Sequence, residues 1–198
     1  MPDFRRHFHP GGTFFFTVVT HQRTPFLCDP PARLLLRKLV RRCQTRWPFT
    51  MEAVVLLPDH LHAIWTLPPG DAAYSKRWGW IKKEFTCIWL ASDSATPRQT
   101  QGRGRDRYRS VWQRKFWEHT VRSDVDFRRH MEYIHFNPIK HGLARCPHEW
   151  PWSSFHRWVR QGVYDQGWAC SCERPRRAGC ASHQERLSFE DIAHSVGE

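Results

Sequence analysis

The chain has 198 residues, and 31 lysine and arginine side chains against 19 aspartate and glutamate side chains give it a formal net charge of +12. This length is enough for one domain with a proper core, and no apolar run approaches the roughly 18 residues of a membrane span. We therefore expect a protein of a bacterial-type cytosol, associated with the nucleoid, that has no signal peptide and makes no membrane contact. Its positive charge favours a polyanion, and nucleic acid first, as partner.

The first half of the chain alternates strand and helix patterns. A β-branched and aromatic run predicts a strand over residues 13–20. A basic amphipathic helix is expected over 32–46, followed by strands over 51–57 and 60–67. Aromatic and aliphatic residues at helical spacing then predict a helix over 75–91.

A basic segment separates this half from the next predicted strand. Residues 92–110 are rich in arginine and lack apolar periodicity, which predicts a mobile loop. Residues 111–117 alternate well enough for a strand and complete a β-α-β-β-α-β order. That order is typical of a ferredoxin-like, split βαβ fold of the α+β class, with an antiparallel sheet, helices on one face and the other face open.

Two histidines begin the strand that follows the Pro58-Asp59 turn signal. Alternate residues of a strand share a face, so His60 and His62 point the same way. Two neutral imidazoles on a rigid strand suit a divalent metal, provided that a third ligand lies nearby. At this point a structural alternative stays open, in which His60 caps the turn and His62 is only half-exposed.

A second stretch offers polar residues on one face of a helix. Ser123 with Asp126 three residues later resembles a capping box, and Pro138 is expected to end the helix. Tyr133 and Asn137 are four residues apart and therefore lie on one face. The structural alternative is that Tyr133 is an amphipathic aromatic at the core edge and Asn137 a C-terminal cap.

Five longer motifs occur in a fixed order along the chain. They are GGTFFFTVVTHQR, the HLH triplet after VVLLPD, IKKEFT, VWQRKFWEHTVR and HMEYIHFNPIKHGL. Together they resemble the REP-associated tyrosine transposases, a branch of the single-tyrosine HUH transposase superfamily. The resemblance covers about residues 3–168, and several ordered motifs are far more specific than one histidine triplet.

The resemblance implies a metal-dependent endonuclease and strand transferase that acts on single-stranded DNA at hairpin-forming, REP-like repeats during DNA transposition and recombination. It implies that His60, His62 and Asn137 hold Mg²⁺ or Mn²⁺. Tyr133 would be the nucleophile that forms a 5′-phosphotyrosine intermediate and leaves a free 3′-OH. The basic residues expected to contact single-stranded or hairpin DNA are Lys82, Lys83, Arg103, Arg105, Arg107, Arg114 and Lys140.

Two other functions stay open. The same fold could grip hairpin nucleic acid without cutting it, in which case Tyr133 would have no chemical role. The chain could also be another HUH nuclease, a replication initiator or a relaxase, although those enzymes often carry paired tyrosines or a third histidine ligand. The oligomeric state, monomer or homodimer, is left undecided by the sequence.

The end of the chain differs from the rest in composition. Residues 1–169 are expected to form the catalytic domain, and residues 170–198 a flexible, slightly acidic tail. The seven cysteines are scattered, which fits reduced thiols in a cytosol better than a disulfide framework. Zinc is not expected in the tail, because its cysteines and histidine lack the usual C-x₂-C spacing; they are Cys170, Cys172, Cys180 and His183.

Overall fold

The computed structural model describes residues 11–92 and 111–171, so most of the predicted basic loop and of the predicted tail lies outside the described residues. Four strands alternate with helices, as predicted. The strands are β1 (Thr13–Val19), β2 (Thr50–Leu56), β3 (His60–Thr66) and β4 (Trp117–Val121). The helices are α1 (Pro30–Arg46), α2 (Tyr74–Leu90), α5 (Asp124–Lys140) and α6 (Phe155–Arg160), with 3-10 turns η1 (His21–Arg23) and η2 (Pro147–Glu149). None of the helices in these two ranges is long and apolar enough to span a membrane.

The strands form one antiparallel sheet in the order β2-β3-β1-β4. This is the strand order of a split βαβ fold, so the predicted fold class is confirmed. β3 lies inside the sheet, where His62 pairs with Thr17 of β1 on one side and Val55 of β2 on the other. The strand that carries the two histidines is thus held from both edges.

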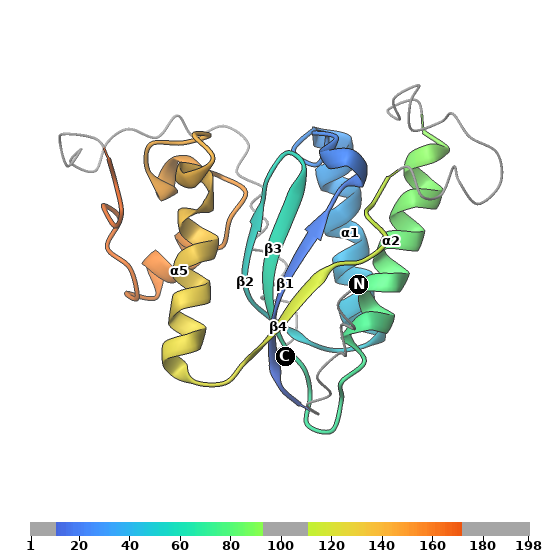
Figure 1. Ribbon diagram of the computed structural model, residues 1–198, viewed down its shortest axis with the longest axis horizontal. Helices are drawn as coiled ribbons and strands as arrows, with labels where there is room; N and C mark the ends of the chain where they lie inside the picture. Colours follow the sequence, from blue (N-terminus) through green and yellow to red (C-terminus); the bar gives the residue numbers. More distant parts are fainter. Residues whose placement is uncertain (1–10, 93–110, 172–198) are drawn as a thin grey trace, which may run out of the picture.

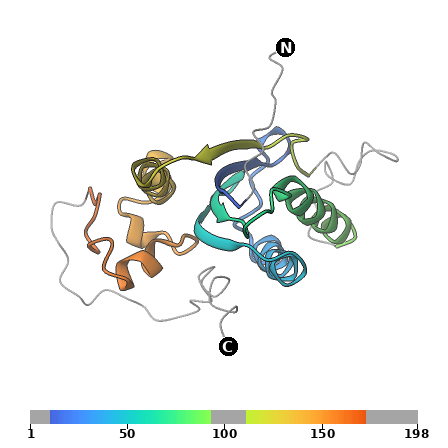
Figure 2. The ribbon, with the colours of Figure 1, turned by 90° about the horizontal axis from the view of Figure 1, so that it is seen from below.

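Helices cover both faces of the sheet, and the expectation of an open face was wrong (Figures 1 and 2). α1 and α2 pack against each other on one face, as predicted, over side chains such as Phe16 and Trp65. α5 packs on the opposite face, where Met131 and Ile134 join Phe15 and Ile64 in a second core. The reason is that β1, β2 and β3 carry apolar side chains on both faces, and an uncovered face would expose them to water.

The fourth strand begins where the predicted one ends. Val111 and Trp112 are buried in the core beneath α1 and α2, and the backbone there makes only an isolated bridge with Thr20. The strand itself, Trp117–Val121, is a half-exposed edge strand with polar residues. Apolar and polar residues therefore alternate less clearly in this strand than in residues 111–116 before it, which is why the sequence predicts the strand too early in the chain.

The helix that carries Tyr133 begins as predicted and ends later. The Ser123 hydroxyl accepts a hydrogen bond from the Asp126 N–H at 3.2 Å, which confirms the cap. Pro138 lies inside the helix, which continues to Lys140. A proline near the end of a helix removes only one backbone hydrogen bond, and the carbonyl of Pro138 still accepts from Leu143 at 2.8 Å.

The aromatic segment after η2, residues 150–154, lies against the free edge of β2 and makes an isolated bridge with it. α6 begins after this segment, at Phe155. Leu56 donates its N–H to the Trp152 carbonyl, and Ser154 donates its N–H to the Val54 carbonyl, both at 2.8 Å. The segment thereby covers an edge that could otherwise pair with another chain.

A disulfide joins Cys146 to Cys170, across 24 residues of sequence. The expectation that all cysteines are reduced thiols was wrong for this pair, whose proximity depends on how the chain folds back after α6. Cys28, Cys43 and Cys87 are free thiols, and burial raises the pKa of both Cys28 and Cys43 to about 12. Cys172, Cys180 and His183 lie outside the described residues.

A buried histidine predicts acid sensitivity of the fold. Burial lowers the pKa of His135 to about 3, and its Nε2 lies 2.9 Å from the Ser154 hydroxyl. The unfolded chain takes up this proton below about pH 6.5, so the free energy of unfolding should be constant above that pH and fall toward pH 3. Each such histidine contributes about 1.4 kcal/mol per pH unit.

Urea denaturation of metal-free protein between pH 7 and pH 4 measures this slope. His135→Gln removes the group that takes up the proton on unfolding, so it should reduce the slope by the equivalent of about one proton. An identical slope in the wild-type chain and His135→Gln would contradict the assignment.

Candidate active site

His60 and His62 lie on the α5 face of β3, and both side chains are buried, each with 4% of its surface exposed. Their alternation with Leu61 and Ala63, which pack under α1 and α2, produces this placement. The two rings are 5.0 Å apart between centroids. The structure thus brings the two histidines side by side, as the sequence predicts, but buries them more deeply than a half-exposed surface pair.

Hydrogen bonds at Nδ1 orient both imidazoles. The Asp59 carboxylate lies 2.6 Å from Nδ1 of His60, and because a carboxylate only accepts, this nitrogen donates. The Thr17 hydroxyl lies 2.9 Å from Nδ1 of His62. With Nδ1 of His60 as donor, Nε2 of that ring carries the lone pair, whereas the Thr17 hydroxyl can donate to or accept from Nδ1 of His62. A histidine held by a carboxylate or hydroxyl at Nδ1 is the usual arrangement behind a metal ligand.

Burial keeps both imidazoles neutral. It is the main cause that lowers the pKa of His60, against the opposing effect of the hydrogen bond that this ring donates to Asp59. For His62, burial, with added repulsion from His60, His141 and Lys140, lowers the pKa to about 3. Partial burial opposes the ionisation of Asp59, but hydrogen bonds from His60 and Arg23 outweigh it and lower the pKa of this carboxyl. At neutral pH the site therefore presents two uncharged lone pairs.

Tyr133 and Asn137 come from the face of α5 that meets β3. The Tyr133 ring lies 5.2 Å from the His62 ring and 6.0 Å from the Phe15 ring, and 39% of the residue is exposed. One turn later, Asn137 is fully buried, and its Nδ2 donates to the Tyr133 carbonyl at 3.3 Å. An exposed phenol beside a buried histidine pair is chemically unlike an ordinary aromatic at the core edge.

The donor atoms fit a divalent metal. Nε2 of His62 and Oδ1 of Asn137 are buried, and neither has a hydrogen-bond partner among residues 11–92 and 111–171. Buried polar atoms are normally paired, so such orphans point to a missing ligand. Two neutral imidazoles and one amide oxygen are acceptable ligands for Mg²⁺, Mn²⁺ or a similar ion, and a set of three leaves coordination positions for substrate and water.

The predicted DNA contacts divide between the two sides of the molecule. Lys140 lies at the site, with its Nζ 3.4 Å from the Tyr133 hydroxyl and 4.8 Å from the centre of its ring. Lys82 and Lys83 are on α2, across the sheet from α5, and Lys82 Nζ donates to the carbonyl of Gln113 at 2.5 Å. Arg114 is exposed in the segment before β4, and Arg103, Arg105 and Arg107 lie outside the described residues.

Sequence reasoning missed several residues of the site. Thr17 and Asp59 hold the histidines, yet Thr17 looked like an ordinary strand residue and Asp59 like a turn residue. His141, just after α5, stacks edge-on to His60 at 5.2 Å. The position of Asp59 next to His60 was a signal available in the sequence, whereas Thr17 meets His62 only through the pairing of β1 with β3.

A second group of polar rings borders the tyrosine. His119 of β4 stacks on His130 of α5 at 4.6 Å between centroids and on the exposed Trp117 at 6.0 Å. The Asp126 carboxylate lies 2.9 Å from His119 and 3.0 Å from His130. His130 also contacts Phe15, which in turn contacts Tyr133. A row of aromatic rings thus extends from the site along β4.

Comparisons with known proteins agree on one family. The chain is 39% identical over 169 residues to a REP-associated tyrosine transposase of Escherichia coli K12, with 85% of this chain and 92% of the relative covered. It is 36% identical over 173 residues to a relative from Haemophilus influenzae named for the same family, with 85% and 93% covered. A solved structure of a REP-associated tyrosine transposase bound to a REP hairpin matches with a TM-score of 0.72 and 36% identity, covering 91% of this chain and 100% of that one. No family model matches the sequence.

The hydrogen bond from His60 to Asp59 yields a test of the metal site. Asp59→Asn removes the charge that holds the imidazole while it keeps the side-chain size, so the affinity for Mn²⁺ should fall about 10- to 100-fold. Calorimetric titration of the purified chain measures this affinity. Asp29→Asn, a change at an exposed residue whose side chain makes no cap hydrogen bond, is the matched control and should bind Mn²⁺ like the wild-type chain. Equal affinities in both variants would show that Asp59 does not support a ligand.

Proposed function

Because the chain belongs to the REP-associated tyrosine transposases, we propose that it cleaves single-stranded DNA beside a hairpin formed by a repeated element and holds the cut strand on Tyr133. The observation that carries this proposal is the meeting of an exposed phenol with a buried, neutral histidine pair and a buried amide oxygen. Family membership establishes an enzyme of the tyrosine transposase type. The roles of individual residues in the proposal go beyond it.

The metal site proposed for the reaction consists of His60, His62 and Asn137. Nε2 of each histidine and Oδ1 of the asparagine would hold Mg²⁺ or Mn²⁺, which would supply Lewis-acid polarisation of a phosphodiester oxygen. Asp59 and Thr17 make hydrogen bonds with Nδ1 of the two rings and thereby fix their orientation. Burial prevents protonation of the imidazoles, which would otherwise compete with the ion.

Tyr133 performs the covalent step. Its Oη forms a bond to phosphorus, the bond from phosphorus to the 3′ oxygen breaks, the phenolic proton passes to water, and the 3′ oxygen takes up a proton. The products are a 5′-phosphotyrosine and a free 3′-OH. Strand transfer is the reverse step with a different 3′-OH as the attacking group. Because one phosphodiester replaces another, the step needs no external energy source.

Lys140 lies where the phosphate arrives. Its ammonium group is within 3.4 Å of the Tyr133 hydroxyl and is exposed, so it can neutralise a phosphate oxygen while the tyrosine attacks. The chain's net positive charge favours the same polyanionic substrate. The row of Trp117, His119 and His130 beside the site offers stacking surfaces for unpaired bases, which supports single strands over duplex.

The DNA partner proposed for this chain is a hairpin with single-stranded flanks. Its relative was solved bound to a REP hairpin, and the likeness covers almost all of both chains. The alternative of a replication initiator or relaxase has no support, because the relatives belong to another branch of the superfamily. The alternative of a non-catalytic hairpin-binding protein leaves the orphaned donor atoms and the exposed phenol unexplained.

The nucleophile is tested by Tyr133→Phe. This change removes one exposed oxygen and leaves the ring contacts intact, so hairpin binding should persist while the covalent adduct disappears. The measurement is a denaturing gel of labelled hairpin DNA with a single-stranded flank, incubated with protein and Mn²⁺. Adduct formation should fall by at least about 1,000-fold, to background, because the remaining groups offer no substitute nucleophile.

Tyr164→Phe is the matched control. Tyr164 is buried, and its hydroxyl has no partner in the described part of the chain, so its removal should change neither folding nor cleavage. Full adduct formation by Tyr133→Phe would disprove the assigned nucleophile. Loss of the adduct in both variants would show that the effect of Tyr133→Phe does not come from the missing hydroxyl.

A further inference from the structure

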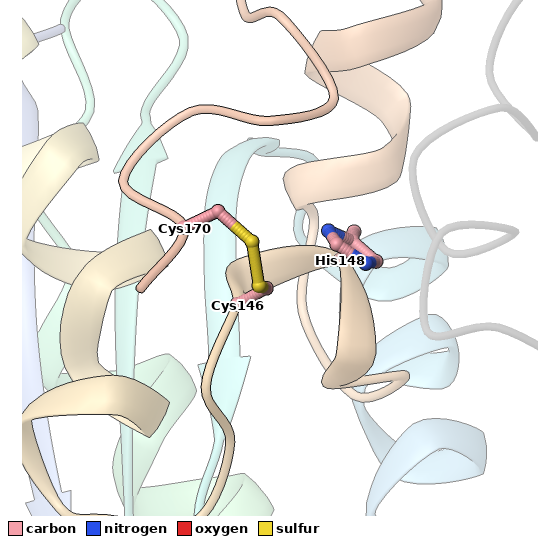
Figure 3. Close-up of side chains that lie close together, drawn as sticks. All are labelled: Cys146, His148 and Cys170. Carbon is pink, nitrogen blue, oxygen red and sulfur yellow. A yellow bond between two sulfur atoms is a disulfide. The ribbon is translucent and has the colours of Figure 1, made fainter. Parts of the chain in front are cut away.

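Cys146, His148 and Cys170 lie together at η2, and none of them belongs to the candidate active site (Figure 3). One ligand atom from each residue lies within 4.8 Å of the others. Cys146 is fully buried, and the other two residues are half-buried. Cys146 caps the 3-10 turn that contains His148, whereas Cys170 belongs to the segment that returns after α6. Two soft sulfurs and an imidazole therefore meet from distant parts of the sequence.

The cluster is held in place by more than the disulfide. The Glu149 carboxylate accepts hydrogen bonds from the N–H of Arg145 at 2.9 Å and of Cys146 at 3.3 Å, which fixes the turn. The Arg145 carbonyl accepts from the N–H of Ser171 at 3.1 Å and from its hydroxyl at 2.8 Å. These bonds keep the two segments adjacent, so the sulfurs remain close to each other when the S–S bond is reduced.

His148 supplies the second, independent indication of a ligand. Its Nδ1 is buried and has no hydrogen-bond partner within the described ranges. A buried ring nitrogen without a partner is unusual. Burial removes the water that would form a hydrogen bond with the nitrogen, and another group normally takes its place. Coordination of a cation would satisfy this nitrogen. The half-exposed ring also leaves a route by which an ion can enter.

We propose that Cys146, His148 and Cys170 bind zinc when the disulfide is reduced, so that the zinc form and the disulfide form are alternatives. Thiolate and imidazole are the ligands that Zn²⁺ prefers, at bond lengths of about 2.3 Å to sulfur and 2.0 Å to nitrogen. The ligand atoms already lie within 4.8 Å of one another, and after reduction the two sulfurs need to separate only to about 3.8 Å, the spacing that two such bonds to one tetrahedral ion require. Three protein ligands leave the fourth position for water or another donor.

Conversion between the two forms balances in electrons and protons. A dithiol reductant transfers two electrons to the Cys146–Cys170 bond and becomes a disulfide itself, and the two protein sulfurs become thiols. Zn²⁺ then binds both sulfurs and releases their two protons. An oxidant of the disulfide class reverses the process, re-forms the S–S bond and expels the ion. In either form the segment after α6 stays tied to the turn that follows α5.

The test uses the full-length chain and Co²⁺ as a spectroscopic probe, because thiolate coordination to Co²⁺ gives a charge-transfer absorption that a site of histidine and amide ligands does not give. Protein reduced with a dithiol and stripped by chelation is titrated anaerobically with Co²⁺, and zinc is then added in competition. One thiolate-bound Co²⁺ per chain, displaced by zinc, is the expected result. The same chain with its disulfide intact should show no such absorption.

His148→Gln identifies the site without removing a cysteine, and it should weaken Co²⁺ affinity by more than about 100-fold. Cys146→Ser and Cys170→Ser should each abolish the absorption. His156→Gln and Cys87→Ser, changes at a half-buried histidine and at an exposed thiol, are the matched controls and should bind like the wild-type chain. The proposal is overturned if the reduced chain gives no thiolate absorption, if the absorption of His148→Gln titrates with the same Co²⁺ affinity as that of the wild-type chain, or if the oxidised chain gives the same absorption.

Discussion

The alternation of side chains along β3 is the constraint on which the rest of the site depends. Leu61, Ala63 and Trp65 pack beneath α1 and α2, which forces His60 and His62 to the opposite face. Because β3 lies between β1 and β2, neither histidine can shift without breaking pairs on both sides. A slip of one residue would bury the imidazoles in an apolar core and remove them from the site.

α5 supplies the remaining residues of the site. Its apolar residues Met131 and Ile134 pack on the sheet, and the same helical geometry sets Tyr133 and Asn137 toward β3. The packing of α5 also excludes water from the histidines, which lowers their pKa and leaves neutral ligands. Core packing and chemistry therefore share one cause: the burial that stabilises the second sheet face is also what prepares the imidazoles for a metal.

Much of this arrangement could be predicted from the sequence. The family, the fold class, the shared face of the two histidines and the cap at Ser123 follow from periodicity and ordered motifs. The runs VVLL and HAIW, apolar on both faces, also indicated a sheet covered on both sides, although the fold pattern suggested an open face. The roles of Tyr133, His60, His62 and Asn137 stay predictions, supported by the exposure of the tyrosine, the burial of the other three residues and the contacts among them.

Other features could not be read from local patterns. The edge strand Trp117–Val121 is partly exposed to solvent and carries polar residues. Its sequence therefore looks more like a loop than the sequence of the buried segment before it. The Cys146–Cys170 pair and the support of His62 by Thr17 depend on contacts between residues far apart in sequence. Neither contact leaves a spacing that a single sequence reveals.

The proposed attachment of the DNA strand to the tyrosine of α5 can be located by peptide mapping. The covalent adduct formed with hairpin DNA is trapped, the DNA and the protein are digested, and mass spectrometry locates the remaining nucleotide. We expect a phosphate-linked nucleotide on the peptide that contains Tyr133 and on no other. A nucleotide attached to a different tyrosine, or to a serine or cysteine, would contradict it.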